Sequence, residues 1–273
     1  MKTVKNIGYV ILILLGLAAL VLLCTALMQI AMGVFGEIMN IAISEDTLYS
    51  VSGTLGIALV GILLAAYVRK KKNQDGNTQT KDFDIKKALV YGGLAICICQ
   101  IFFSAVTTLF LARFVPMAYE QTYSGSICIN IICGVILAPI GEELLFREGL
   151  YSLLKRRFQG VSAIVICALI FGMSHGYHAL GIASCCLAGV IFTLIYEKTG
   201  SVWYSILAHA MCNLHSLIFN MMEQKGVTFL GLPLQYEVNG YNMYHVAVIV
   251  VAVLFCIAIV YFRNMQLKNI AVD

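Results

Sequence analysis

Charged residues are scarce in this chain. Asp, Glu, Lys and Arg make up 12% of its 273 residues, whereas apolar residues make up 60%. A soluble domain carries about 25% charged residues, so this composition excludes a soluble globular protein and indicates an integral membrane protein. The net charge of +4 is small, and the basic residues fall between apolar runs. We therefore expect no nucleic-acid partner.

Two cysteine and histidine signatures are absent as well. None of the ten cysteines forms a C-x-x-C pair, and all ten lie in apolar runs. This pattern favours small buried side chains over disulfides or zinc thiolates. The sequence H-E-x-x-H does not occur either, so zinc has no local signature here.

Long apolar runs predict an all-α, polytopic membrane helix bundle of about eight transmembrane helices, because about 20 apolar residues suffice to cross a bilayer. The predicted spans cover residues 8–36, 50–68, 88–112, 125–145, 161–175, 182–196, 202–222 and 244–262. The first is expected to be tilted or broken near Gly33. Residues 69–87, RKKKNQDGNTQTKDFDIKK, are predicted to form a basic, mobile cytoplasmic loop.

The distribution of basic residues tests this count. With eight spans and both termini in the cytoplasm, only Arg113 and Lys225 lie outside, so 16 of the 18 Lys and Arg residues lie inside. That bias follows the positive-inside rule. The sequence thus predicts a multi-pass protein of the cell membrane, most simply the bacterial plasma membrane. We divide it into N-terminal helices (1–123), a core that holds the motifs below (124–220), and an outer loop with a final helix (221–273).

Two adjacent acids stand at membrane depth in the stretch APIGEELLFREGLYSLLKRR. Glu142 and Glu143 end an apolar run, and a carboxylate placed there is a functional candidate by default. Arg147 lies four residues after Glu143, so the two share a helix face and can pair. Glu142 points about 100° away from Glu143. Pro139 is expected to kink or loosen the helix near the acids, and an amphipathic helix is expected to follow.

Two later apolar runs carry a polar pair each. FGMSH places Phe171 and His175 four residues apart, and HAMCN does the same for His209 and Asn213. Each pair lies on one helix face. A buried carboxylate has a raised pKa, which suits a general base near neutral pH. Glu142, helped by a histidine, could therefore activate water, while His209 and Asn213 could donate hydrogen bonds to an oxyanion.

Other readings of these residues stay open. Each polar side chain could instead hold the bundle together by a helix–helix hydrogen bond. Glu142, His175 and His209 also form a Glu/His/His set, which is a known pattern for catalytic zinc. Phe171 cannot do acid–base chemistry and is expected to keep the site dry. The remaining polar residues of the spans are expected to lie at interfaces or make helix contacts: Gln100, Asn130, His178, His215 and His245.

The three motifs resemble those of the CPBP family, which includes type II CAAX prenyl endopeptidases and Abi, or bacteriocin-processing and immunity, proteins. Its pattern is E-E-x-x-x-R, then F-x-x-x-H, then H-x-x-x-N. All seven positions match in order: Glu142, Glu143, Arg147, Phe171, His175, His209 and Asn213. The resemblance covers residues 124–217.

The resemblance implies an eight-helix intramembrane protease, a hydrolase whose cavity opens toward the cytoplasm. It implies that Glu142 and His175 activate water and that His209 and Asn213 hold the oxyanion. Glu143 and Arg147 would organise the site, and Arg147 could contact substrate. The family is often labelled metalloprotease; a mechanism without a cofactor is preferred here, and zinc is the alternative. The expected partners are the lipid bilayer and a peptide or lipidated protein substrate.

Three functions remain to be separated. The preferred one is an intramembrane endopeptidase that cleaves a membrane-associated or lipidated peptide. The second is a non-catalytic immunity or regulatory membrane protein, against which the intact motifs argue. The third is a proton-coupled transporter, because buried Glu and His also relay protons. No internal repeat is evident in the sequence, which disfavours a transporter.

Overall fold

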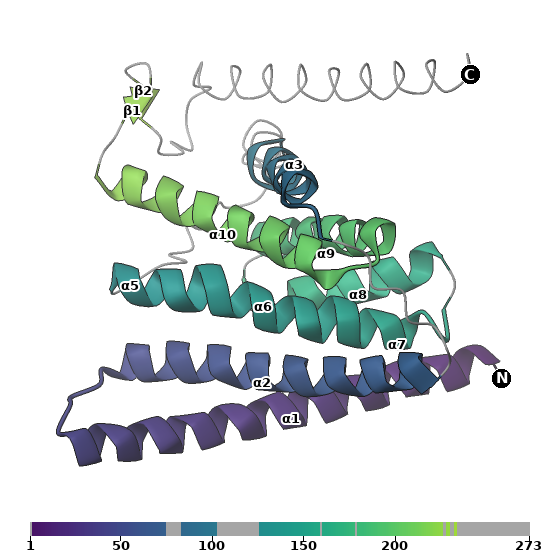
Figure 1. The fold of residues 1–273 in the computed structure, drawn as a ribbon, viewed down its shortest axis with the longest axis horizontal. Helices are drawn as coiled ribbons and strands as arrows, with labels where there is room; N and C mark the ends of the chain where they lie inside the picture. Colours follow the sequence, from purple (N-terminus) through teal and green to yellow (C-terminus); the bar gives the residue numbers. More distant parts are fainter. Residues whose placement is uncertain are drawn as a thin grey trace.

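The chain folds into helices, as expected. The computed structural model describes residues 2–74, 83–102, 126–158, 160–177, 179–225, 228–229 and 232–233. Its helices, with η marking π-helix, are α1 (Lys2–Met39), α2 (Glu45–Gln74), α3 (Ile85–Ala95), η1 (Ile96–Phe102), α5 (Ile127–Ile129), η3 (Asn130–Leu137), α6 (Ala138–Glu143), η4 (Leu144–Tyr151), α7 (Ser152–Leu154), α8 (Val161–Met173), α9 (Ala179–Thr199) and α10 (Val202–Gln224). Two short strands, β1 (Thr228–Phe229) and β2 (Leu232–Pro233), pair antiparallel. The all-α prediction is confirmed (Figure 1).

Several helices can cross a bilayer. Five are long and apolar enough: Asn6–Met39, Glu45–Gln74, Ile127–Leu154, Ala179–Thr199 and Val202–Met222. Large apolar side chains stay exposed along α1 and α2, as expected where a helix faces lipid. The chain is a multi-pass membrane protein. The count of eight and the side of the termini stay predictions, because the span expected at 244–262 lies outside the described residues.

Three local expectations differ from the structure. The first span was expected to be tilted or broken near Gly33, and α1 runs through Gly33 without a break to Met39. The loop expected at 69–87 is shorter, because α2 continues to Gln74 and α3 begins at Ile85. The span expected at 182–196 is longer, because α9 covers Ala179–Thr199. Helical hydrogen bonding thus extends past the ends of the apolar runs that defined the spans.

One continuous helix carries the acidic motif. The elements α5, η3, α6, η4 and α7 join into a single helix over Ile127–Leu154, called the motif helix below. Pro139 lies in α6, between two π-helical stretches, in line with the loosening that its missing N–H predicts. The helix expected to continue after the motif is found, since η4 and α7 extend it to Leu154, but all eight residues of η4 are buried. Neighbouring helices cover η4.

Glycines let these helices approach closely. A Cβ at Gly141 would lie 2.7 Å from Ala58 Cα, and a Cβ at Gly61 would overlap the Gly141 carbonyl oxygen. Similarly, a Cβ at Gly172 of α8 would lie 2.8 Å from the carbonyl oxygen of Ile182 in α9. Small residues of this kind allow helix backbones to touch within a membrane. The backbone just before Glu142 therefore rests directly on α2.

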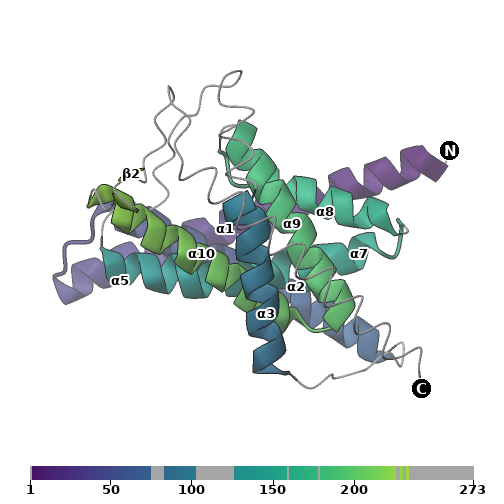
Figure 2. The ribbon, with the colours of Figure 1, turned by 90° about the horizontal axis from the view of Figure 1, so that it is seen from above.

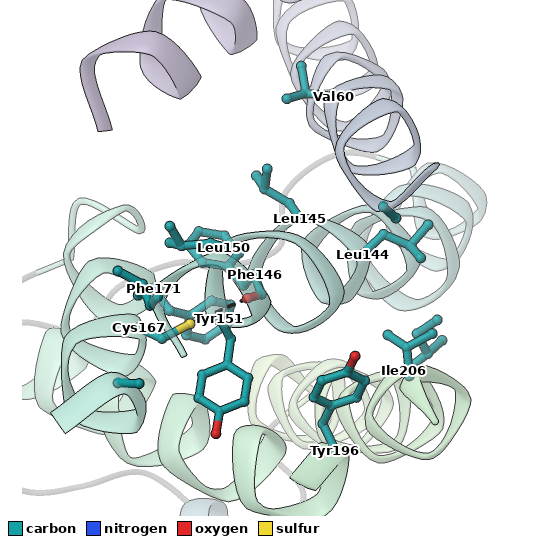
Figure 3. Close-up of a cluster of buried hydrophobic side chains, with 14 of the residues drawn as sticks. Val60, Leu144, Leu145, Phe146, Leu150, Tyr151, Cys167, Phe171, Tyr196 and Ile206 are labelled. Carbon is teal, nitrogen blue, oxygen red and sulfur yellow. Dashed lines mark hydrogen bonds between the residues drawn. The ribbon is translucent and has the colours of Figure 1, made fainter. Parts of the chain in front are cut away.

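The main apolar core surrounds the second half of the motif helix. Its buried side chains come from α1, α2, η4, α7, α8, α9 and α10. Figure 3 shows part of this cluster, including Phe146 and Phe171, whose ring centroids lie 5.1 Å apart in an edge-to-face arrangement. This packing fixes α8, and with it Phe171 and His175, against the motif helix.

The start of α1 and the end of α7 lie at the same end of the bundle, at the right of Figure 1, and basic residues make contacts there. Arg157 lies over the ring of Tyr9, 4.7 Å from its centroid, and Lys155 pairs with Glu197 at 2.6 Å. The start of α1 and the ends of α2, α7 and α9 thus share this end, called the basic end below. Figure 2 shows α3 and α9 crossing the direction of α10.

Candidate functional site

Glu143 lies at the centre of the polar groups brought together by the fold. Its side chain is fully buried. Its Oε1 atom accepts hydrogen bonds from Arg147 Nη1 at 2.9 Å and from His209 Nδ1 at 2.8 Å. The four-residue spacing predicts the first contact, whereas the second joins the motif helix to α10. Glu143 therefore organises two of the other motif residues.

Arg147 is enclosed by protein. Its side chain has no exposed surface, and its Nη2 donates to the Gly189 carbonyl of α9 at 3.3 Å. The guanidinium lies over the rings of Phe171 and Phe192, 4.3 and 5.3 Å from their centroids. These contacts balance its buried charge. Of the two roles that the resemblance offers for Arg147, the geometry favours organising the site over touching substrate.

Glu142 faces two histidines from different helices. Its Oε2 lies 3.8 Å from His175 Nε2 at the end of α8 and 4.0 Å from His209 Nε2 on α10. This oxygen has no hydrogen-bond partner among the groups that the structure describes. The Glu142 side chain is 15% exposed, whereas that of Glu143 has no exposed surface. Glu142 is thus the acid of the pair that is free to react.

The hydrogen bonds of the two histidines fix where their protons lie. His175 Nδ1 is 2.8 Å from the Phe171 carbonyl oxygen, and His209 Nδ1 is 2.8 Å from the Glu143 carboxylate. A carbonyl and an ionised carboxylate can only accept, so both Nδ1 atoms must donate. A neutral imidazole then presents a lone pair at Nε2. Three acceptors therefore converge at Glu142.

Asn213 bonds to the motif helix rather than to Glu142. Its Nδ2 donates to the Gly134 carbonyl oxygen at 2.8 Å. Gly134 lies in η3, eight residues before Glu142. This bond joins α10 to the first half of the motif helix. One amide hydrogen of Asn213 is thus committed to fixing helix position.

Phe171 packs beside the site, as expected. It is 2% exposed, and its ring makes edge-to-face contacts with His175 and His209 at centroid distances of 4.7 and 5.9 Å. Phe192 stacks on the other side of His209 at 4.8 Å. Aromatic rings therefore enclose the histidines and exclude water from their flanks.

Two of the other polar residues make contacts elsewhere in the described structure. Gln100 accepts a hydrogen bond from Ser216 at 3.2 Å, which is the helix contact expected of it. His215 stacks on Phe219. His178 and His245 lie outside the described residues. None of the nine cysteines that the structure describes forms a disulfide bond with another of them.

The site lies deep in the bundle. Ala58, which touches Gly141, precedes Arg69 at the basic end by eleven residues of α2, a distance of about 16 Å along a helix. The hydrocarbon core of a bilayer is about 30 Å thick. The acids thus lie about half the thickness of a hydrocarbon core from Arg69 along the bundle.

The donor atoms do not close into a metal site. In the described part of the chain, no three His, Cys, Asp or Glu side chains are arranged to hold a metal ion. Ligands about 2.0–2.1 Å from a tetrahedral zinc lie about 3.4 Å apart. The separations from Glu142 Oε2 to the two Nε2 atoms are 3.8 and 4.0 Å. As they stand, Glu142, His175 and His209 do not fit zinc.

One charged pair was missed by the sequence interpretation. Glu148, the residue after Arg147, is 8% exposed and forms two hydrogen bonds with Arg69 of α2, at 2.7 and 2.6 Å. Arg69 was assigned to the basic loop, and Glu148 lies outside the three motifs. The signal that could have found the pair is an acid within an otherwise apolar run.

An apolar groove runs beside the site. It has a volume of about 670 Å³ and lies between α10 and the motif helix. Its lining includes Ile140, two residues before Glu142, and Ala210, the residue after His209. Trp203 and Phe83 lie at its other end. The groove thus passes from the first turn of α10 to the level of the acids.

Comparison with known proteins gives a family match for these residues. Residues 124–215, called the CPBP segment below, match the family described as type II CAAX prenyl endopeptidase Rce1-like. All three motifs lie within that stretch. The chain is also similar to a protein of Bacillus subtilis (strain 168) named "Putative membrane peptidase YdiL", at 30% identity over 95 residues.

The extent of these matches is limited. The alignment with the Bacillus subtilis protein covers 34% of this chain and 38% of that protein. No solved structure matches the chain. The comparisons thus relate part of this chain, with the stretch that carries the three motifs, to membrane peptidases.

Proposed function

We propose that this protein is an intramembrane endopeptidase in which Glu142 activates a water molecule. One observation carries this proposal: Glu142 Oε2 lacks a hydrogen-bond partner in the described structure and faces two imidazole Nε2 atoms at 3.8 and 4.0 Å. A water that donates hydrogen bonds of about 2.8 Å to two acceptors spans acceptors about 4 Å apart. Glu142 and either histidine therefore suit a bound water.

The reaction follows from the acceptors. Glu142 takes one proton of the water while His175 Nε2 accepts a hydrogen bond from the other. The oxygen then attacks the carbonyl carbon of the scissile peptide bond, and a tetrahedral intermediate forms. Protonated Glu142 returns its proton to the leaving nitrogen, the C–N bond breaks, and a carboxyl and an amine product leave. No covalent enzyme intermediate is needed.

His209 and Asn213 are the proposed oxyanion donors. Because His209 Nδ1 already donates to Glu143, Nε2 can donate only when both ring nitrogens carry protons. The Glu143 carboxylate would offset the charge of such an imidazolium. The Asn213 amide is the second proposed donor, and its Nδ2 also bonds the Gly134 carbonyl oxygen. In this mechanism, Glu143 acts through His209.

The apolar groove supports a membrane-embedded substrate. Its lining residues are apolar, and it reaches the level of Glu142 through Ile140 and Ala210. The acyl or prenyl chain of a lipidated peptide, or the apolar side chains of a membrane peptide, would be shielded from water there. We propose substrates of these classes, in a bacterial plasma membrane, with maturation or immunity peptides as candidates.

The proposal is tested by peptide cleavage with purified protein in liposomes. Wild type, Glu142→Gln and the control Glu37→Gln, which changes an exposed acid of α1, are incubated with a library of lipidated and plain peptides. We expect cleavage by wild type and Glu37→Gln and none by Glu142→Gln. Equal cleavage by Glu142→Gln would refute the role given to Glu142.

A zinc chelator added to the same assay separates the two mechanisms. Cleavage that survives chelation supports water activated by Glu142 alone. Loss on chelation, with recovery on adding zinc, would instead support the zinc alternative and require Glu142 and the histidines to move together.

The same variant separates the other functions. If the protein works only by binding, cells that carry Glu142→Gln keep the immunity phenotype. If it is a proton-coupled transporter, the variant loses proton dependence without any cleavage by wild type. The unpartnered Glu142 oxygen beside two histidines favours the peptidase.

A further inference from the structure

α2 carries no motif residue, yet it supports the half of the motif helix that bears the acids. Gly61 touches Gly141 through the backbone, and a Cβ at Gly149 would overlap the Leu64 side chain. The two helices run in the same direction toward the basic end (Figure 1). Glu142 follows Gly141 directly, so its position depends on how the motif helix lies on α2.

An ion pair closes this contact at the basic end. Arg69 Nε and Nη2 donate to Glu148 Oε1 and Oε2 at 2.7 and 2.6 Å. Both hydrogen bonds are charge-assisted, and a bidentate guanidinium–carboxylate pair fixes orientation as well as distance. The Glu148 side chain is 10% exposed, whereas that of Arg69 is 52% exposed.

We propose that the Arg69–Glu148 pair positions Glu142. The pair and the Gly61–Gly141 contact hold the motif helix at two points, about 10 Å apart along its axis. A single contact would let the motif helix pivot or rotate on α2, and rotation would carry Glu142 away from His175 and His209. The two contacts together prevent this rotation. Arg69 and Glu148 are positioning residues, and Arg69 lies outside the CPBP segment. The kinetic part of this proposal rests on the proposed function.

The unequal exposure of the partners sets the order of effects. Arg69→Ala leaves the Glu148 carboxylate buried without a counter-charge, whereas Glu148→Gln leaves an arginine that water can reach. Arg69→Ala should therefore lower the stability of the protein more than Glu148→Gln does. The double variant should lower it less than Arg69→Ala alone, because it removes the uncompensated charge.

The first experiment measures thermal unfolding in detergent. We expect Arg69→Ala to lower the Tm by several degrees, and Glu148→Gln and the double variant to lower it less. Lys155→Ala is the matched control, since Lys155 pairs with Glu197 at the same end but both partners are more exposed. If Arg69→Ala shifts the Tm no more than Lys155→Ala, the pair does not hold the helices.

The second experiment measures positioning. Arg69→Ala is expected to lower kcat roughly 10- to 100-fold, as small misplacements of catalytic groups do, with KM little changed. Arg69→Lys, which keeps the charge, should recover part of this loss. A Tm loss with wild-type kcat would make the pair merely structural and overturn the proposal.

A third readout needs no substrate. A hydrophobic carbodiimide labels buried carboxyl groups, and mass spectrometry gives the rate at Glu142 relative to the exposed Glu37. We expect faster labelling of Glu142 in Arg69→Ala, because the motif helix is free to turn; an unchanged rate overturns the proposal. If wild type cleaves no peptide, the proposed function fails while this measurement still decides whether the pair positions Glu142.

Discussion

Glu143 Oε1 and His209 Nδ1 lie 2.8 Å apart although 66 positions separate the two residues. The same oxygen accepts from Arg147 at 2.9 Å. A buried carboxylate shared in this way orients the imidazole and neutralises the guanidinium. The two hydrogen bonds link Glu143 and Arg147 of the motif helix with His209 of α10.

Replacing Glu143 by Gln should destabilise the protein strongly. The substitution leaves the Arg147 guanidinium buried without a counter-charge, which costs about 3–5 kcal/mol. Unfolding in detergent measures this loss. Glu197→Gln is the control, because its pair with Lys155 is more exposed and such pairs contribute about 0–1 kcal/mol. Equal stability of the two variants would mean that the Glu143 carboxylate is not needed to neutralise the buried Arg147 guanidinium.

The same carboxylate should matter for turnover. Because the hydrogen bond to Glu143 orients His209, Glu143→Gln is expected to lower kcat by at least about tenfold in the molecules that remain folded. Cleavage rates corrected for the folded fraction provide the measurement. If Glu143→Gln turns over substrate at the wild-type rate per folded molecule, Glu143 has no part in the mechanism.

Alanine at Gly61 should be harmful, whereas alanine at Gly53 should not. A Cβ at Gly61 would overlap the Gly141 carbonyl oxygen, but nothing lies within 4 Å of a Cβ at Gly53 in the same helix. Glycine to alanine normally stabilises a helix by about 1 kcal/mol, so Gly53→Ala should raise the Tm slightly or leave it unchanged. Gly61→Ala should lower both the Tm and the cleavage rate. Similar behaviour of the two variants would contradict the close approach of α2 and the motif helix.

Leucine at Phe171 should slow cleavage with little unfolding. The Phe171 ring lies 4.3 Å from the Arg147 guanidinium carbon and touches both histidines. Leucine keeps most of the apolar contact but loses the cation–π attraction, worth about 0.5–2 kcal/mol. We expect a several-fold loss of kcat. Leu169→Ala, at an exposed position of α8, should retain wild-type activity, and equal rates for both variants would deny Phe171 this role.

Reporter fusions should place the basic end in the cytoplasm. A reporter fused after Gln74, at the end of α2, is expected to be cytoplasmic, whereas one fused after Ala42, between α1 and α2, is expected to be outside. The physical reason is the excess of Lys and Arg at the basic end. The opposite pattern would show that the basic end lies outside the cell and would contradict the predicted topology.

The sequence predicts the local part of this site well. Glu143 and Arg147 are one helical turn apart, so their contact follows from helix geometry alone. His209 and Asn213 likewise share a face of α10, whereas His175 lies two residues beyond the end of α8 at Met173, in a turn. Composition and apolar runs likewise suffice to predict a membrane helix bundle.

Contacts between helices could not be predicted in the same way. The Glu143–His209 bond depends on how α10 crosses the motif helix, and no spacing in the sequence encodes that crossing. The bond from Asn213 to Gly134 depends on a π-helical carbonyl. Arg69 was misplaced because its charge suggested a loop, whereas its side chain is held by Glu148 at the end of a continuous helix.

The hydrogen bonds of the two histidines also determine which ring nitrogen can exchange protons. Because each Nδ1 hydrogen is held by an internal acceptor, protons can be exchanged with substrate and water only through Nε2, on the side of Glu142. The Nδ1 hydrogens should therefore exchange slowly with deuterium and give separate downfield resonances in a magnetic resonance spectrum. They would serve as native reporters of an assembled site, visible before any substrate is known.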